Sequence, residues 1–103
     1  MGTRPNDEHT KVFAYYLGRG IKAARKLRGM KASTLAVDVG ITEQSVSNIE
    51  TGKAVPSLKT LLDIARHLNV PLWQLIRPAE KFAAIADTMS VDAQRRKTED
   101  EGD

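Results

Sequence analysis

One short predicted helix carries several polar side chains on its outward face. We expect Thr42 to cap this helix, which spans residues 43–51, with Val46 and Ile49 facing inward. The outward residues are Glu43, Gln44, Ser47 and Asn48. Glutamine and asparagine can pair bidentately with adenine, and glutamate can accept a hydrogen bond from the N4 amino group of cytosine. The face therefore suits either the reading of base edges or simple solvation.

The sequence offers no set of residues for catalysis or metal binding. Cysteine is absent, which excludes disulfides, thiolate zinc sites and cysteine nucleophiles. The two histidines, His9 and His67, have no carboxylate or second histidine at ligand spacing. We therefore expect no metal, no cofactor and no enzymatic activity.

Basic residues are unevenly distributed along the chain. The 103 residues carry a net charge of +3, but four of the acidic residues fall within residues 99–103. Residues 1–98 therefore hold 16 basic and 9 acidic residues, and six bases without an acid lie between Arg19 and Lys31. A cluster of one sign suits a polyanion such as nucleic acid, or a solvated helix face.

Helical periodicity dominates, and no run alternates apolar and polar residues over the length of a strand. We predict an all-α fold, a compact five-helix bundle with a short weak C-terminal helix and a mobile tail. The first helix begins near Asn6 or Asp7 and ends at Gly29, and the others span residues 32–39, 43–51, 58–68 and 71–76. Gly18 and Gly20 are expected to weaken the first helix and to mark either a kink in it or its true start. Because only three residues separate the second and third helices, these two must cross steeply, as in a helix-turn-helix.

The pattern divides the chain into four parts. We expect a flexible N-terminal arm over residues 1–10, a helix-turn-helix domain over residues 11–77, a candidate dimerisation helix over residues 78–89 and a disordered charged tail over residues 90–103. No apolar run approaches the roughly 18–20 residues that span a membrane. The polar first ten residues contain no secretory core, so we expect a cytoplasmic protein without membrane contact.

Residues 17–76 resemble the Cro and phage-repressor type of helix-turn-helix domain, also called the XRE family. The stretches that carry the resemblance are Leu35-Ala36, Gly40-Ile41-Thr42, Val46-Ser47-x-Ile49-Glu50-x-Gly52, Pro56-Ser57, Ile64-Ala65 and Leu68-Asn69-Val70. The resemblance implies a sequence-specific transcriptional regulator, of repressor type. Such a protein reads the major groove of double-stranded DNA with the helix of residues 43–51.

The resemblance also implies roles for individual residues. The base readers are expected to be Gln44, Asn48, Ser47 and Glu43, with Gln44 foremost. Phosphate contacts are expected from Lys31, Ser33, Ser45, Lys53, Ser57 and Lys59. Arg25 and Glu50 match positions that form a partly buried ion pair in the family, so Arg25 is expected to serve the fold rather than DNA.

One module makes few base contacts, so we expect a homodimer on a palindromic operator. The apolar residues that suit a two-fold interface are Trp73, Phe82, Ile85, Ala86 and Met89. The alternative function is that of an interaction module, antitoxin-like or co-activator-like. Such a module would bind a protein partner through its termini, residues 1–16 and 79–103.

Overall fold

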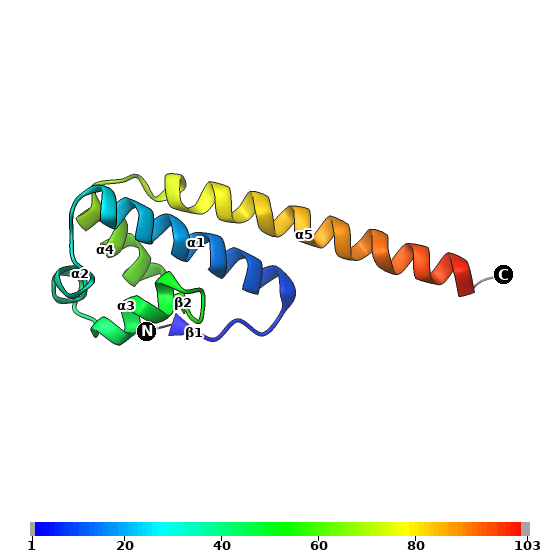
Figure 1. The fold of residues 1–103 in the computed structure, drawn as a ribbon, viewed down its shortest axis with the longest axis horizontal. Coiled ribbons are helices and arrows are strands. Elements are labelled where there is room, and N and C mark those ends of the chain that lie inside the picture. Colours follow the sequence, from blue (N-terminus) through cyan, green and yellow to red (C-terminus); the bar gives the residue numbers. More distant parts are fainter. Residues whose placement is uncertain (1, 102–103) are drawn as a thin grey trace.

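The computed structural model describes the backbone of residues 2–101 and the side chains of residues 2–89. Its elements are the helices α1 (Glu8–Leu27), α2 (Ala32–Val39), α3 (Glu43–Glu50), α4 (Leu58–Leu68) and α5 (Leu72–Glu101), with the short strands β1 (Gly2–Thr3) and β2 (Val55–Pro56). α1 lies between α5 on one side and α3 and α4 on the other (Figure 1). The predicted all-α fold is confirmed, with a two-stranded sheet added to it.

Capping residues fix where the helices begin and end. Asp7, Thr42 and Ser57 each accept a hydrogen bond from the backbone amide three residues later. Gly40 and Asn69 end α2 and α4 in the left-handed conformation. Because these signals are local, the bounds of α2 and α4 agree with the predicted ones and those of α3 differ by one residue.

The N-terminal segment is paired, in place of the flexible arm predicted for residues 1–10. Gly2 and Thr3 are the antiparallel partners of Pro56 and Val55. In addition, the Nδ1 atom of His9, in the first turn of α1, lies 2.6 Å from a carboxylate oxygen of Asp87 on α5. A strand of two residues has no alternation to detect in the sequence, so this pairing could not be predicted.

α5 is one continuous helix of 30 residues that extends well beyond α1 to α4 (Figure 1). The sequence predicts instead a helix over residues 71–76, a weak helix over residues 78–89 and a disordered tail over residues 90–103, of which residues 102–103 lie outside the described chain. Pro78 lies inside α5, but the buried Ala79 and Ala83 hold the helix just beyond it. A helix started by packing then extends at little cost. Among the described residues no helix, α5 included, is both long and apolar enough to cross a membrane.

α1 and α3 approach each other closely at Gly18. A Cβ atom on Gly18 would overlap the carbonyl oxygen of Ile49 and lie 2.7 Å from that of Glu50. A Cβ atom on Gly20 would meet nothing closer than a methyl group of Leu75 at 3.8 Å. α1 runs without interruption from Glu8 through both glycines, so neither marks the start of the helix, and only Gly18 is required by a close contact.

A buried ion pair joins the C-terminal end of α3 to α1. Nε and Nη2 of Arg25 donate to the two carboxylate oxygens of Glu50 at 2.7 and 3.0 Å, and Nη1 donates to the carbonyl of Met30 at 2.8 Å. The two side chains are only 10% and 6% exposed. The hydrogen bond to Glu50 raises the pKa of the Arg25 guanidinium. Arg25 therefore belongs to the interior, as the family resemblance implies.

The two glycines of α1 should respond oppositely to substitution. We expect Gly18→Ala to lower the free energy of unfolding by more than about 2 kcal/mol, because α3 must move away from α1. Gly20→Ala should raise it by about 0.5–1 kcal/mol, because alanine favours the helix and the space is open. Urea denaturation of both variants measures the difference. Equal effects from the two substitutions would contradict the close contact at Gly18.

The buried pair predicts a large effect from an isosteric change. Glu50→Gln leaves the Arg25 charge uncompensated, so we expect the free energy of unfolding to fall by about 3 kcal/mol. Glu43→Gln removes the same charge from an exposed position of the same helix and should change stability by less than about 0.5 kcal/mol. Denaturant unfolding compares the two variants. If they are equally stable, Arg25 and Glu50 do not hold α3.

Candidate nucleic-acid interface

α3 turns one face toward the core and leaves the other at the surface. Val46 and Ile49 are buried against the neighbouring helices. Three of the four predicted base readers are exposed: Glu43 and Gln44 in the first turn of the helix, and Ser47 one turn further along. Asn48, the residue after Ser47, is half-buried. The outward face of α3 is therefore accessible to a ligand, while Glu50 fixes the C-terminal end of the helix.

Gln44 and Asn48 interact with each other. Nε2 of Gln44 donates to Oδ1 of Asn48 at 3.0 Å. A side-chain amide has two N–H groups and one carbonyl oxygen, so Gln44 still has one donor and its acceptor free. Bidentate recognition of adenine requires one donor and one acceptor from the same amide. The hydrogen bond thus orients Gln44 without using up the groups that would contact a base.

Glu43 places a carboxylate at the N-terminal end of α3. The helix dipole favours a negative charge at this position. Among the described side chains, neither Lys31 nor another base forms an ion pair with Glu43. Glu43 is therefore available to accept a hydrogen bond from cytosine, and its charge would repel a phosphate placed there.

The predicted phosphate ligands differ in their exposure and in whether their side chains already form hydrogen bonds within the protein. Lys31 and Ser33 are exposed at the N-terminal end of α2, where the Lys31 side chain makes no capping bond. Lys53 is exposed in the turn after α3. Ser45 is half-buried, and its hydroxyl accepts a hydrogen bond from Thr42 at 2.8 Å. Lys31, Ser33 and Lys53 are thus the better placed of these four.

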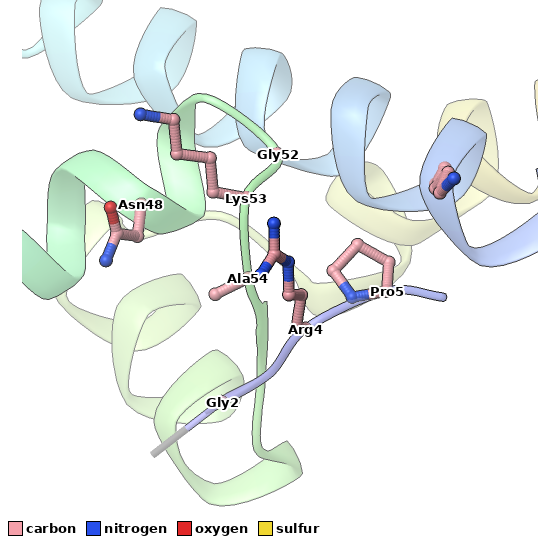
Figure 2. A pocket seen from close by; sticks show the side chains of 8 residues that line it. Gly2, Arg4, Pro5, Asn48, Gly52, Lys53 and Ala54 are labelled. Carbon is pink, nitrogen blue, oxygen red and sulfur yellow. The ribbon is translucent and has the colours of Figure 1, made fainter. Parts of the chain in front are cut away.

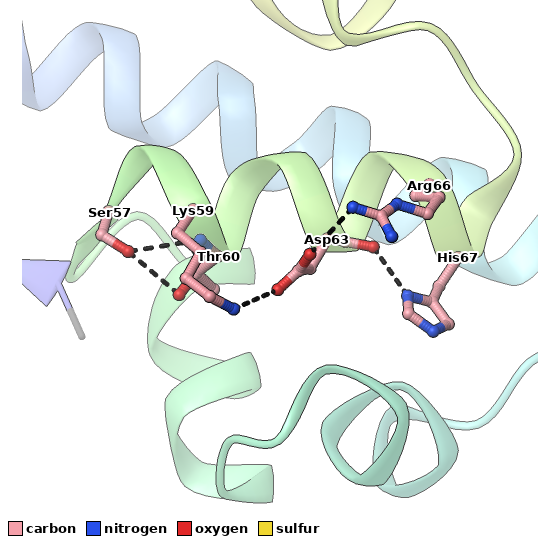
Figure 3. Close-up of polar contacts among 6 residues, drawn as sticks. All are labelled: Ser57, Lys59, Thr60, Asp63, Arg66 and His67. Carbon is pink, nitrogen blue, oxygen red and sulfur yellow. Dashed lines mark hydrogen bonds and ion pairs between the residues drawn. The ribbon is translucent and has the colours of Figure 1, made fainter.

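Two further predicted phosphate ligands, at the start of α4, already interact with other side chains of that helix (Figure 3). Nζ of Lys59 lies 2.9 Å from a carboxylate oxygen of Asp63, and the hydroxyl of Ser57 donates to that of Thr60 at 3.0 Å. The hydrogen bond from Lys59 is the main cause that lowers the pKa of Asp63. Asp63 therefore competes with a phosphate for Lys59, although an exposed pair of this kind is weak and can be exchanged.

Two basic residues that no sequence pattern singles out line a pocket that also includes one predicted base reader, Asn48. Arg4 and Lys11 line one pocket, of about 580 Å³, with Asn48 and Lys53 (Figure 2). Gly2, Pro5, Gly52 and Ala54 complete its wall. Arg4 reaches this place because β1 pairs with β2. Contacts between segments more than 50 residues apart leave no local signal in the sequence.

The basic cluster predicted between Arg19 and Lys31 does not form one surface. Arg25 is buried, as described above. Arg19, Lys22 and Lys26 line a separate shallow hollow on α1. Lys31 lies at the start of α2. The bases that line the pocket with Asn48, which are Arg4, Lys11 and Lys53, come from other parts of the chain.

The family described as Helix-turn-helix matches residues 21–72, which is half of the chain. The HTH-type transcriptional regulator SutR of Escherichia coli (strain K12) is 34% identical over 67 residues. The alignment covers 65% of this chain and 38% of SutR, so the chain spans well under half of this relative.

Two similar solved structures contain DNA. PlcR of Bacillus thuringiensis, in complex with the peptide PapR7 and DNA, is 35% identical with a TM-score of 0.57, over 60% of this chain and 22% of that one. SinR, a master regulator for biofilm formation in complex with DNA, is 32% identical with a TM-score of 0.54, over 57% of this chain and 95% of that one. The family match covers half of the chain, and the chain belongs to the helix-turn-helix family.

Proposed function

We propose that this protein is a sequence-specific DNA-binding transcriptional regulator that inserts α3 into the major groove. The observation that carries the proposal is the geometry of α3. The ion pair of Glu50 fixes the C-terminal end of this helix, and Glu43, Gln44 and Ser47 are exposed on its outward face. A recognition helix contacts base edges with the residues near its N-terminal end. The name of SutR, and the DNA in the PlcR and SinR structures, support the same function.

In this proposal the polar residues divide into two groups. Gln44 and Asn48 read bases as a hydrogen-bonded pair, and Ser47 and Glu43 adjust the choice of sequence. The groups that contact phosphates are Lys31, Ser33 and Lys53, with Ser45, Ser57 and Lys59 in supporting places. Base contacts specify the site, whereas phosphate contacts set position and affinity. We infer repression, because an occupied operator blocks other proteins without any further activity.

Removal of either reader should change the DNA sequence that is selected. From a pool of random duplexes we expect the parental protein to enrich one motif, and Gln44→Ala and Asn48→Ala to lose preference at one or two positions. Each lost bidentate contact costs about 1–3 kcal/mol of discrimination. Sequencing of the bound pool, followed by titration of the enriched duplex, measures both effects.

Gln74→Ala is the matched control for this experiment. Gln74 is an exposed amide at the start of α5, and its loss should leave the selected motif unchanged. Binding of the parental protein should also weaken steeply as the salt concentration rises. If the two reader variants enrich the parental motif with parental strength, α3 does not read the sequence.

α5 offers a surface for a second copy of the chain. Phe82, Ile85 and Met89 are exposed and, at about 100° per residue, lie on one flank of the helix. Phe82 stacks on Tyr16 of α1, with ring centroids 4.2 Å apart, which fixes this flank relative to the domain. We propose that the flank forms a two-fold interface that places two copies of α3 on the half-sites of a palindrome.

Two of the residues predicted for the interface have a different position on α5. Trp73 is exposed but lies about 180° around the helix from Phe82, so one flat surface does not include both. Ala86 is half-buried and lies at the edge of the flank. The N-terminal segment, which the alternative interaction module would use, already pairs with β2. The proposed interface therefore consists of Phe82, Ile85 and Met89.

Negative charges introduced on this flank should dissociate the proposed dimer. We expect the parental protein to sediment as a dimer at high concentration, and Ile85→Glu/Met89→Glu to sediment as a monomer, because two carboxylates would be buried in each half of the interface. Leu27→Glu changes the highly exposed residue that ends α1 and should leave the dimer intact. A parental protein that remains monomeric, with and without the selected duplex, would refute the interface.

A further inference from the structure

We infer that Arg4, Lys11 and Lys53 form a binding site for a phosphate group of the DNA backbone, beside Asn48. The site exists because the N-terminal segment pairs with β2, and it enlarges the surface presented by α3. The inference rests on the proposed function, since the phosphate belongs to the strand whose bases α3 reads. It adds Arg4 and Lys11 to the residues that hold DNA.

The N-terminal segment is held at both ends, so Arg4 is positioned. Gly2 lies so close to β2 that a Cβ atom would come within 2.6 Å of the carbonyl oxygen of Val55. At the other end Asp7 caps α1 through the amide of Thr10. Pro5, next to Arg4, restricts the backbone between these anchors. Little conformational freedom remains for this segment to lose when a ligand binds.

The pocket between this segment and α3 has a positively charged lining. Three cationic side chains line it and no acidic one does. Within residues 2–89, the side chains of Arg4, Lys11 and Lys53 form no ion pair. The nearby acid Asp7 hydrogen bonds to Thr10, which is the main cause that lowers the pKa of Asp7, and it attracts Lys11 only weakly. An open pocket with this lining suits an anion, and arginine binds phosphate oxygens bidentately.

The position of the pocket favours a backbone phosphate over a free one. Asn48 belongs both to the wall of the pocket and to the reading pair with Gln44. Figure 2 shows Asn48 and Arg4 on opposite sides of Ala54, with Lys53 above it. A second hollow shares Gly2, Asn48 and Ala54 with the pocket and continues along α3 to Ser45. A DNA strand that contacts Asn48 would therefore pass its phosphates along this wall.

Removal of the two new cations should weaken binding without affecting the fold. We expect Arg4→Ala/Lys11→Ala to bind the selected duplex about tenfold more weakly, the size of one charge-assisted hydrogen bond. The slope of log K against log salt should become shallower by about 0.9, which corresponds to one phosphate. The melting temperature and the selected motif should stay unchanged, because both residues are exposed and contact no base.

The matched control is Arg77→Ala/Lys81→Ala, which removes the same charge from exposed positions on α5, on the other side of α1 from α3 (Figure 1). It should keep the parental affinity within about twofold and the parental slope. If the two double variants lose affinity equally, only the net charge matters and the site is refuted. If Arg4→Ala/Lys11→Ala keeps both affinity and slope, this inference fails while the proposed function stands. If the parental protein selects no duplex, both fail.

Uncharged methylphosphonate linkages identify the phosphate. We expect one linkage per half-site at which the substitution weakens the parental protein about tenfold but weakens Arg4→Ala/Lys11→Ala no further. Additive losses at every linkage would overturn the assignment. Titration of the DNA-free protein with inorganic phosphate tests the other source. Shifts of the Arg4 and Lys53 amide signals that saturate at micromolar phosphate would identify a free anion as the ligand instead.

Discussion

The contact between α1 and the C-terminal end of α3 is the constraint on which the rest of the structure depends. A glutamate at the end of a helix is disfavoured by the helix dipole, and Glu50 is stable there because Arg25 holds both of its carboxylate oxygens. Gly18 allows the backbones to approach to a distance that no other residue permits. The ion pair and the missing side chain at Gly18 together determine the orientation of α3 relative to α1.

In this arrangement one face of α3, a helix of only eight residues, holds the helix in the domain, and the opposite face carries the groups proposed to recognise DNA. One face of α3 supplies Val46, Ile49 and Glu50 to the interior, and the other supplies Glu43, Gln44 and Ser47 to the surface. A rigid support limits the entropy that is lost when a helix docks into a groove. The N-terminal segment and the turn after α3 add charge on one side of the same surface. Specificity and affinity thus come from different parts of the chain.

Local signals explain which features the sequence predicts. Thr42 and Ser57 are caps, and Gly40 ends α2, so the helices between them follow from residue type and apolar spacing. Features that depend on tertiary contact are not predictable in this way. Gly18 and Gly20 look equivalent in the sequence. They differ only because the backbone of α3 lies against Gly18 and not against Gly20.

The same limit applies to the ends of the chain and to the candidate site. The residues of α3 that face outward follow from helical spacing, and the structure exposes Glu43, Gln44 and Ser47 as expected. The place of Arg4 depends on a two-residue strand pairing, and the length of α5 depends on packing that carries a helix past Pro78. Neither depends on a pattern within a short window.

A crystal structure of the protein with its selected duplex tests the central claim most directly. We predict that α3 lies in the major groove, with the Gln44 amide within hydrogen-bond distance of a base edge. A complex in which α3 faces away from the DNA, or in which another element occupies the groove, would contradict it.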